Sequence, residues 1–291
     1  METTEARKTV ETAGMQETAE MPGTAEMPET PETLETAEVL ETAGAAELPG
    51  PERRPLNREA IKYIAVIAMT FNHIAHASLL PYGSPLYELF VDIGYVTAVT
   101  MSFFLVEGYH YTRSKARYCL RLFLFALLAQ APYSAAFQTD TLNMFFTLWL
   151  CFLILLVLDR VPYWILRIPI LAVLVFLSLF CDWPLTIAVS TILFAWSRRD
   201  KRRQVLSYAL AALLHGYMEY AYFSTVYAAG DGALHALGAA VPMGVSAVLT
   251  LGLYNGTQAR NHRAFHRWFF YIYYPAHLTL LCLIRYRLYG W

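Results

Sequence analysis

Apolar runs, most of them long enough to cross a lipid bilayer, alternate with short polar connections from Ile61 to Trp291. A transmembrane helix needs about 20 predominantly apolar residues. About nine segments can be laid out on this basis. The sixth is short and begins at Pro184, so eight or ten spans stay open. The segments are 60–80, 86–111, 118–138, 142–158, 163–181, 184–197, 204–226, 233–254 and 268–288. The pattern predicts an all-α fold, a polytopic transmembrane helical bundle.

The first 55 residues have a different pattern. They repeat a Glu-Thr-Ala theme with Met-Pro steps and contain no aromatic residue. Twelve glutamates against Arg7 and Lys8 give residues 1–50 a net charge of −10, while the remainder carries +9. Such a segment has too little apolar surface to offset the entropy of ordering. We expect residues 1–55 to be a disordered acidic tail, a solvated extension or a docking segment, and residues 56–291 to be the membrane domain.

Composition narrows the class further. Hydrophobic residues make up 57% and charged residues 15% of the chain, which excludes an ordinary soluble domain. The four cysteines are scattered singly without a C-x-x-C spacing, so we expect neither a disulfide framework nor a metal site. The sequence contains no nucleotide-binding glycine loop and no pattern typical of nucleic-acid binding. Membrane lipid is the partner that the composition implies.

Basic residues predict the orientation. One set of connections carries nearly all of them, while the loops near residues 81–85, 133–141, 182–184 and 227–232 contain no Lys or Arg. Cytoplasmic loops carry an excess of Lys and Arg. We therefore expect a multi-pass protein of the cell membrane with a cytoplasmic N-terminus and an external C-terminus. Arg285 and Arg287 are the exceptions. The basic positions on the predicted cytoplasmic side are Arg53, Arg54, Arg58, Lys62, Arg113, Lys115, Arg117, Arg160, Arg198–Arg203, Arg260, Arg263 and Arg267.

Several polar side chains lie inside the apolar runs. His73 is in the first run, Glu107 and His110 are near the end of the second, Asn143 opens the fourth and His277 is in the last. An ionised side chain at the bilayer centre costs roughly 3 kcal/mol. These residues therefore predict a polar cavity within the bundle. Histidine is also the side chain best suited to exchange protons near neutral pH.

A structural interpretation stands beside the functional one. A lone intramembrane histidine often makes only a helix–helix hydrogen bond. The pair Glu107 and His110 could be a structural ion pair near Arg113. His215 and Glu219, four residues apart, are expected to hydrogen-bond to each other. The other residues with a plausible packing role are His76, His235, Asn143 and Thr147.

Five stretches of sequence indicate a family. They are IAVIAMTFNHI (64–74), FFLVEGYHYTR (103–113), YCLRLFLFALLAQAPY (118–133), NMFFTL (143–148) and WFFYIYYPAHL (268–278). In this order they resemble the TraX family of conjugal-transfer membrane proteins, from about Leu56 to the C-terminus. The known member of that family N-acetylates the amino terminus of a conjugative pilin. It belongs to a wider group of polytopic acyltransferases that use cytosolic acetyl-CoA.

The resemblance implies an N- or O-acetyltransferase with acetyl-CoA as acyl donor and a pilin-like protein or an envelope glycan as acceptor. Acyl transfer needs a base, donors for the developing oxyanion and a route for the thioester. His73 is the expected base, His277 a second proton-transfer or donor group, and Asn143 an oxyanion donor. The residues expected at the cytoplasmic mouth, where the CoA phosphates or the thioester arrive, are Glu107, His110 and Arg113.

One position departs from the family pattern. The first motif of the family typically reads Asp-His, whereas this chain has Asn72 before His73. If the carboxylate orients the imidazole, Asn72→Asp should raise activity. Two other functions remain open. Intramembrane His and Glu also build proton relays, which would suit a proton-coupled transporter, and a non-catalytic assembly factor is the third possibility.

Overall fold

The computed structural model describes residues 54–226 and 229–290, so the predicted acidic tail lies almost wholly outside the described residues. Within the described residues the chain forms nine α-helices and no β-strand. The helices are α2 (Arg58–Ile74), α3 (Pro85–Tyr111), α4 (Lys115–Phe137), α5 (Met144–Arg160), α6 (Trp164–Leu177), α7 (Thr186–Ser197), α8 (Lys201–Val226), α9 (Ala229–Ala247) and α10 (Arg263–Tyr289). The π-helical turns η1 (Ala75–Leu79) and η3 (Val248–Leu253) extend α2 and α9, and the 3₁₀ turn η2 (Ser178–Phe180) follows α6.

Each of the nine predicted segments coincides with one helix to within about five residues at either end, when η1 and η3 are counted with the helices that they extend. The helices begin where the sequence supplies capping side chains. Asn57 accepts a hydrogen bond from the backbone N–H of Ala60 at 2.8 Å, and Ser84 accepts one from Tyr87 at 3.2 Å. Such caps satisfy N–H groups that the first turn leaves without partners. The apolar runs and their polar starts therefore determine the helices locally.

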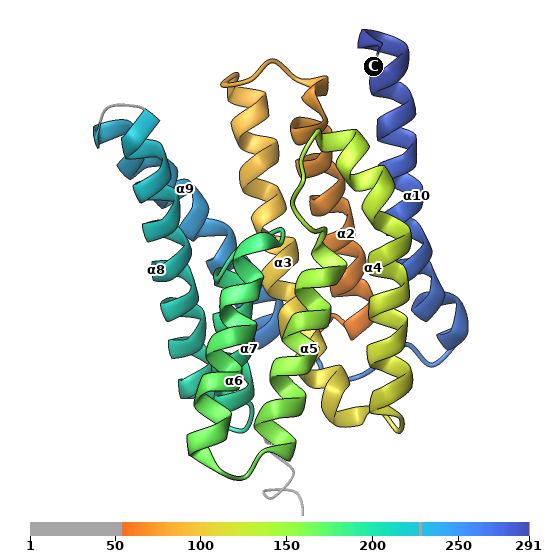
Figure 1. Ribbon diagram of the computed structural model, residues 1–291, viewed down its shortest axis with the longest axis vertical. Coiled ribbons are helices and arrows are strands. Elements are labelled where there is room, and N and C mark those ends of the chain that lie inside the picture. The colour runs from red at the N-terminus through yellow and green to blue at the C-terminus, as the bar shows by residue number, and fades with distance from the viewer. Residues whose placement is uncertain (1–53, 227–228, 291) are drawn as a thin grey trace, which may run out of the picture. The chain divides into compact units, whose positions relative to one another are not determined.

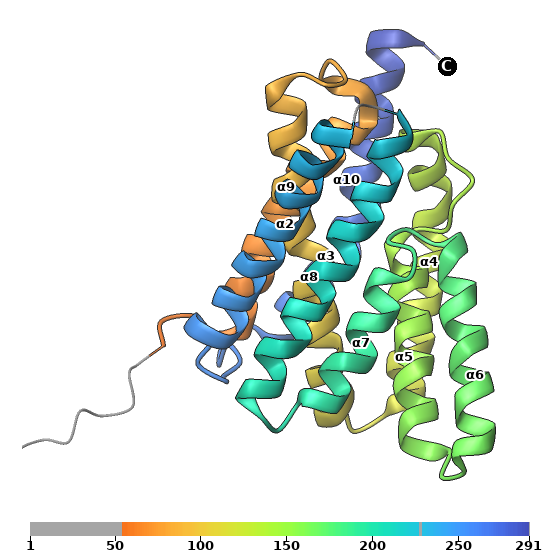
Figure 2. The ribbon, with the colours of Figure 1, turned by 90° about the vertical axis from the view of Figure 1, so that its left-hand side faces the viewer.

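The helices pack side by side as a bundle (Figures 1 and 2). α2 packs along α3, α8 along α9, and α10 along α4. The start of α2 and the ends of α3, α5 and α7 lie at the same end of the bundle, the lower end in Figure 1. Many of the basic residues lie there, so we call it the basic end. We call the opposite end, where α3 begins, the far end.

Helices α5, α6 and α7 are shorter than their neighbours and stop before the far end (Figure 1). The connection after α4 runs down the bundle before α5 begins. It meets the connection between α6 and α7 in an isolated parallel bridge of Leu142 with Cys181. There Leu142 N–H donates to the carbonyl oxygen of Phe180 at 2.9 Å, and Asp182 N–H donates to that of Leu142 at 2.6 Å. These connections form a polar layer inside the bundle.

Within the described part of the chain, three helices are long and apolar enough to cross a membrane, judged by length and composition. They are Pro85–Tyr111, Lys115–Phe137 and Gly232–Leu253. The stretches Trp164–Phe180 and Thr186–Ser197 are apolar but shorter. α6 contains no buried residue, and most of its large apolar side chains are exposed. An exposed apolar helix of this kind is typical of a protein surface in contact with lipid.

Candidate functional site

His73 and His277 form a hydrogen-bonded pair inside the bundle. His73 lies in the last turn of α2, and His277 lies in α10, two residues after Pro275. His73 Nδ1 and His277 Nε2 are 2.6 Å apart, and both side chains are buried. The fold thus brings together two of the histidines selected from the sequence.

The hydrogen bonds around the pair determine where its protons lie. The second ring nitrogen of His277, Nδ1, is 2.9 Å from the carbonyl oxygen of Tyr273. A carbonyl oxygen only accepts, so this Nδ1 carries a proton and Nε2 of the neutral ring must accept. His73 Nδ1 therefore donates between the rings. His73 Nε2 is left with a lone pair, as a general base requires.

The backbone around the pair is held by further contacts. Thr70 Oγ1 donates to the carbonyl oxygen of Val66 at 2.8 Å, and the Tyr273 hydroxyl is 2.8 Å from the same Oγ1. Because that oxygen already donates its hydrogen, Tyr273 is the donor of the second bond. This bond joins α2 to α10 one turn before each histidine. The π-helical turn η1 begins two residues after His73, and such turns are frequent at functional sites.

A cavity of about 380 Å³ lies beside His73, and we call it the histidine pocket. It is bordered by α2, α3, α8 and the polar layer of connections. No Lys or Arg is found among the described residues that line it. The His, Asp and Glu side chains that line it are His73, His76, Asp182, His215 and Glu219. The pocket therefore offers hydrogen-bond acceptors and proton-exchanging groups, without a permanent positive charge.

Asp182 belongs to the connection between η2 and α7, outside every helix. Its backbone carbonyl oxygen accepts from the Thr147 hydroxyl. Burial raises the pKa of the Asp182 carboxyl to about 7, and a hydrogen bond from the Trp183 backbone N–H opposes the shift only in part. A carboxyl group that titrates near neutral pH thus lines the same pocket as His73.

Asn72 has a different role from the one expected beside His73. Its Nδ2 donates to the carbonyl oxygen of Val91 in α3 at 3.0 Å. A Cβ atom placed on Gly94 would come within 2.1 Å of Asn72 Cβ, so this glycine makes room for the amide. Asn72 therefore joins α2 to α3, and His277 provides the hydrogen bond that orients His73.

His215 and Glu219 do not form the hydrogen bond expected between them. The His215 ring lies between Tyr95 and Trp183, with ring centroids 4.7 and 5.0 Å away. Its Nε2 is buried and has no hydrogen-bond partner within the part of the chain that the structure describes. Aromatic packing therefore holds this histidine in the wall of the pocket.

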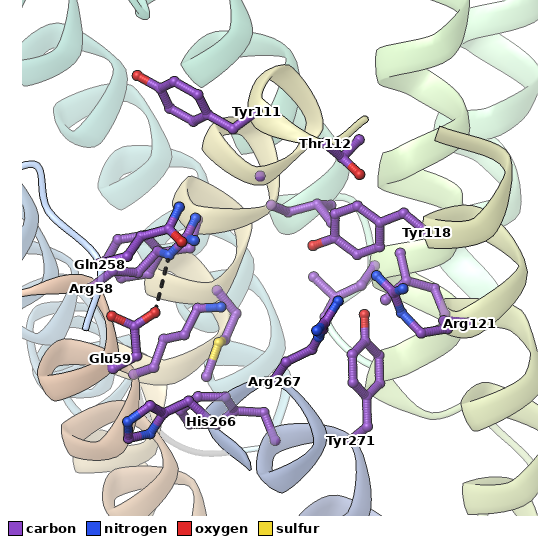
Figure 3. Close-up of a pocket in the computed structure, with 18 of the residues that line it drawn as sticks. Arg58, Glu59, Tyr111, Thr112, Tyr118, Arg121, Gln258, His266, Arg267 and Tyr271 are labelled. Carbon is purple, nitrogen blue, oxygen red and sulfur yellow. Dashed lines mark ion pairs between the residues drawn. The ribbon is translucent and has the colours of Figure 1, made fainter. Parts of the chain in front are cut away.

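A second cavity of about 380 Å³ lies at the basic end, and Figure 3 shows it in close-up. We call it the basic pocket. The Tyr118 and Tyr271 hydroxyls point into it, beside Arg121 of α4 and Arg267 of α10. Apolar side chains, Phe145 among them, line its inner part. The Lys, Arg and carboxylate side chains among its described lining residues are Arg58, Lys62, Arg121, Arg263, Arg267 and Glu59.

Two arginines in this pocket have unused donors. Arg58 Nε and Arg121 Nε are buried, and among the described residues neither has a hydrogen-bond partner. Arg58 Nε lies 3.6 Å from the carboxylate of Glu59, an ion pair drawn as a dashed line in Figure 3. Buried polar groups are normally satisfied, and a guanidinium presents donors that match phosphate and carboxylate oxygens. The basic pocket is therefore suited to an anionic ligand.

Glu107 lies next to the basic pocket and holds one of its arginines. Its Oε1 accepts from the Tyr254 hydroxyl at 2.7 Å, and its Oε2 is 3.9 Å from Arg58 Nη1. His110 is exposed and lines another cavity, between α3, α5 and α7. Arg113 is exposed at the start of the connection to α4. Of the three residues expected at the cytoplasmic mouth, none is among the described residues that line the basic pocket.

Asn143 is fully buried and caps α5. Its Oδ1 accepts from the Phe145 backbone N–H at 2.9 Å. Its Nδ2 donates to the carbonyl oxygen of Ala126 at 2.8 Å and to Gln130 Oε1 at 2.9 Å. An amide has two N–H donors, so neither is left for an oxyanion. The observed contacts of Asn143 are structural.

Aromatic rings separate the two pockets. Tyr271 and Phe145 line the basic pocket, with centroids 5.8 Å apart. Tyr274 packs 4.9 Å from Phe145 and 5.8 Å from His73. The Tyr274 hydroxyl accepts from the backbone N–H of Met144 at 3.3 Å. These rings form a continuous series of contacts from the basic pocket to His73.

The basic pocket could not be predicted from the sequence, although four of the five Lys and Arg residues in its described lining had a place in the charge pattern. Arg58, Lys62, Arg263 and Arg267 were interpreted only as a sign of orientation. Arg121 gave the clearest signal, because it interrupts an apolar run at Y-C-L-R-L-F. Among the described residues, no group of three or more His, Cys, Asp or Glu side chains could hold a metal ion.

A helical bundle with apolar helices of membrane-spanning length and a polar, histidine-containing interior has the architecture of an integral membrane protein. The family model described as TraX protein matches residues 57–285, and the chain belongs to the TraX family. It is 31% identical over 237 residues to the probable fimbrial assembly protein FimC, serogroup H1, of Dichelobacter nodosus. That similarity covers 76% of this chain and 93% of the relative. No solved structure matches the chain.

Proposed function

We propose that this chain is an integral membrane acyltransferase that transfers an acetyl group from acetyl-CoA to an amine or hydroxyl of a pilin-like or other envelope acceptor. Membership of the TraX family and a relative named for fimbrial assembly support this setting. The observation that carries the chemistry is the hydrogen-bonded pair of His73 and His277, which leaves a lone pair on a histidine lining a polar pocket.

The distribution of charge supports a multi-pass orientation with the basic end in the cytoplasm. The connections at that end carry nearly all Lys and Arg, as cytoplasmic loops do. The N-terminus is then cytoplasmic and the C-terminus external. In this orientation the basic pocket opens toward cytosolic acetyl-CoA, and the histidine pocket lies on the side of an envelope acceptor.

The basic pocket supplies what the donor requires. The Arg58 and Arg121 donors and the neighbouring Lys62 suit CoA phosphates. Tyr118 and Tyr271 line the same cavity and can hydrogen-bond to the amides of the pantetheine arm. The arm then extends toward the histidine pair along the aromatic rings. This replaces His110 and Arg113 as the expected donor-binding residues.

The histidine pair performs the proton transfers. His73 Nε2 removes the proton of the acceptor N–H or O–H as its nitrogen or oxygen attacks the thioester carbon. The resulting tetrahedral intermediate collapses, the C–S bond breaks and the acetyl group stays on the acceptor. The CoA thiolate takes the proton from the His73 imidazolium. His277 holds the reactive tautomer of His73 through its bond to the Tyr273 carbonyl oxygen. An amine that arrives as an ammonium must first lose one proton before its nitrogen can attack, and the carboxylates of Asp182 and Glu219, which line the same pocket, can bind the ammonium and accept that proton.

The test uses purified full-length protein, radiolabelled acetyl-CoA and an acceptor peptide with a free amino terminus. His73→Gln removes proton transfer near neutral pH but keeps a hydrogen-bonding amide. We expect the rate to fall by about 10²–10⁴-fold at normal abundance. The matched control is His215→Gln in the wall of the same pocket, which should change stability by ~1 kcal/mol and leave most of the rate.

Three other outcomes would redirect the proposal. Full turnover in His73→Gln would exclude this residue as the base. No turnover in the native protein, with fimbriae lost on deleting the gene, would favour an assembly factor. Acetyl-independent proton movement in vesicles containing the protein would favour a transporter.

A further inference from the structure

A cavity of about 500 Å³ lies at the basic end between α3, α5 and α7, separate from both pockets described above. We call it the α5–α7 groove. Most of its lining is apolar, and Trp196 at its edge is 52% exposed. The apolar residues are Leu155, Leu158, Ile192, Leu193, Ala195 and Trp196.

The polar corner of the groove already has its negative charge compensated. Tyr109 donates to the Asp159 carboxylate at 2.8 Å, and Lys115 Nζ lies 2.6 Å from the same oxygen. Arg160 Nε is 3.6 Å from it. The carboxylate is therefore paired with two cations and gives the groove no attraction for a further one.

Basic residues follow the helix end that borders the groove. Arg198 and Arg199 come directly after α7, two and three residues beyond the Trp196 that lines the groove. Neither arginine makes a side-chain hydrogen bond or ion pair within the described residues. The guanidinium of Arg203 lies 5.1 Å over the Trp196 ring. Arg203 is also paired with Asp200 at 3.4 Å, so of these three arginines it is Arg198 and Arg199 that have no anionic partner among the described residues.

We infer that the α5–α7 groove binds an anionic phospholipid of the cytoplasmic leaflet. One acyl chain lies against the apolar walls, and the phosphate lies at Arg198, Arg199 and His110. An exposed tryptophan beside basic residues is typical of the level of lipid headgroups. A soluble anion would use the arginines but leave the apolar walls uncovered. The inference rests on the membrane orientation proposed above, and it does not depend on acyl transfer.

The experiment measures Trp196 fluorescence in the full-length protein, reconstituted in phosphatidylcholine bilayers. The emission of Trp196 is obtained by subtracting the fluorescence of the Trp196→Phe variant from that of the native protein. Phosphatidylglycerol with brominated acyl chains is the probe, and brominated phosphatidylcholine at the same mole fraction is the reference. We expect the anionic lipid to quench Trp196 at much lower mole fractions than the zwitterionic lipid.

Arg198→Gln and Arg199→Gln should each weaken the preference for the anionic lipid about fivefold, as expected for one basic residue near an anionic surface. Arg117→Gln is the control, an exposed arginine at the same end that lies on α4, a helix that contributes none of the described residues lining the groove. Retention of phosphatidylglycerol in native mass spectrometry provides a second readout for variants of low yield.

Equal quenching by the two lipids would overturn the inference, as would a preference unchanged in both arginine variants. Relief of quenching by added CoA or inorganic phosphate would assign the groove to a soluble anion. Acetyl transfer is assayed separately, so failure of the lipid preference and failure of the acyltransferase proposal are distinguishable.

Discussion

At the scale of single residues, the proton positions around His73 depend on an acceptor that cannot become a donor. The carbonyl oxygen of Tyr273 determines the tautomer of His277, and His277 determines that of His73. No carboxylate takes part in this arrangement of described residues. Asparagine at position 72 is therefore compatible with an oriented base, because its amide is bonded to α3.

The first prediction concerns Asn72→Asp. The sequence alone suggested that a carboxylate there would raise activity, but the structure favours the opposite result. An ionised carboxylate at position 72 would face the Val91 carbonyl oxygen without a donor, and Gly94 leaves it little room to move. An unsatisfied buried group costs about 1–3 kcal/mol, and the loss here should fall at the lower end because position 72 is half-buried. Thermal unfolding in detergent should show this loss. Increased acetyl transfer at unchanged stability would contradict it.

The site could be predicted from sequence only in part, for physical reasons. His73 and His277 could be selected from the sequence because a polar side chain inside an apolar span is costly and rare unless it has a function. Their direct contact could not be derived, because they are 204 residues apart and meet only through the packing of α2 on α10. Asn143 looked like a catalytic amide because a helix cap and an oxyanion donor use the same side chain, and only its neighbours distinguish the two.

At the scale of elements, the helices followed from local sequence, whereas the connections did not. Apolar runs and capping residues define α2 to α10 almost to their ends. The polar layer formed by the connections at 138–143 and 181–185 depends on the bridge between Leu142 and Cys181, a long-range pairing without a sequence signal. This layer brings Asp182 to the histidine pocket.

The second prediction concerns Asp182 and pH. Burial raises its pKa in the folded protein to about 7, above the ordinary value of 3.8. The folded state therefore binds this proton more tightly than the unfolded state. The resulting stabilisation is complete below about pH 4 and is lost as the pH rises through 7. Asp182→Asn should remove this dependence.

Melting temperatures of the two proteins in detergent at pH 5 and pH 8 provide the measurement. The native protein should lose more stability than Asp182→Asn between these values. Taking the difference removes the contribution of the histidines, which both proteins share. Parallel curves would show that Asp182 is solvated in the folded state.

At the scale of the whole molecule, charge separates the two ends of the bundle. Arg58, Lys62 and Arg121 converge on a pocket at one end, while the histidine pocket contains no Lys or Arg among its described lining residues. A protein that receives a polyanionic donor on one side and an amine on the other benefits from this separation. Basic residues in the histidine pocket would repel the amine and attract the polyanionic donor to the wrong side.

The third prediction follows from the same asymmetry. Reporter fusions at Met1 and Trp291 should report opposite sides of the membrane, with Met1 in the cytoplasm. An odd number of helices, as in the described chain, puts the two termini on opposite sides if each helix crosses the membrane. The basic residues at the end where α2 begins put that end in the cytoplasm. A fusion in the connection at residues 198–200 serves as an internal control and should agree with Met1. Reports from the same side for Met1 and Trp291 would require an even number of spans.

The short outer helix α6 has a consequence for the lipids around the protein. Together with η2 it spans Trp164–Phe180, and its apolar side chains face outward. At about 1.5 Å per residue this stretch is about 25 Å long, less than the ~30 Å hydrocarbon core of a typical bilayer. In the multi-pass arrangement proposed above, the surrounding bilayer would have to thin to match this stretch, at a cost that increases with mismatch. The stability of the protein in the membrane then depends on bilayer thickness. This side of the protein fits best in bilayers with shorter acyl chains.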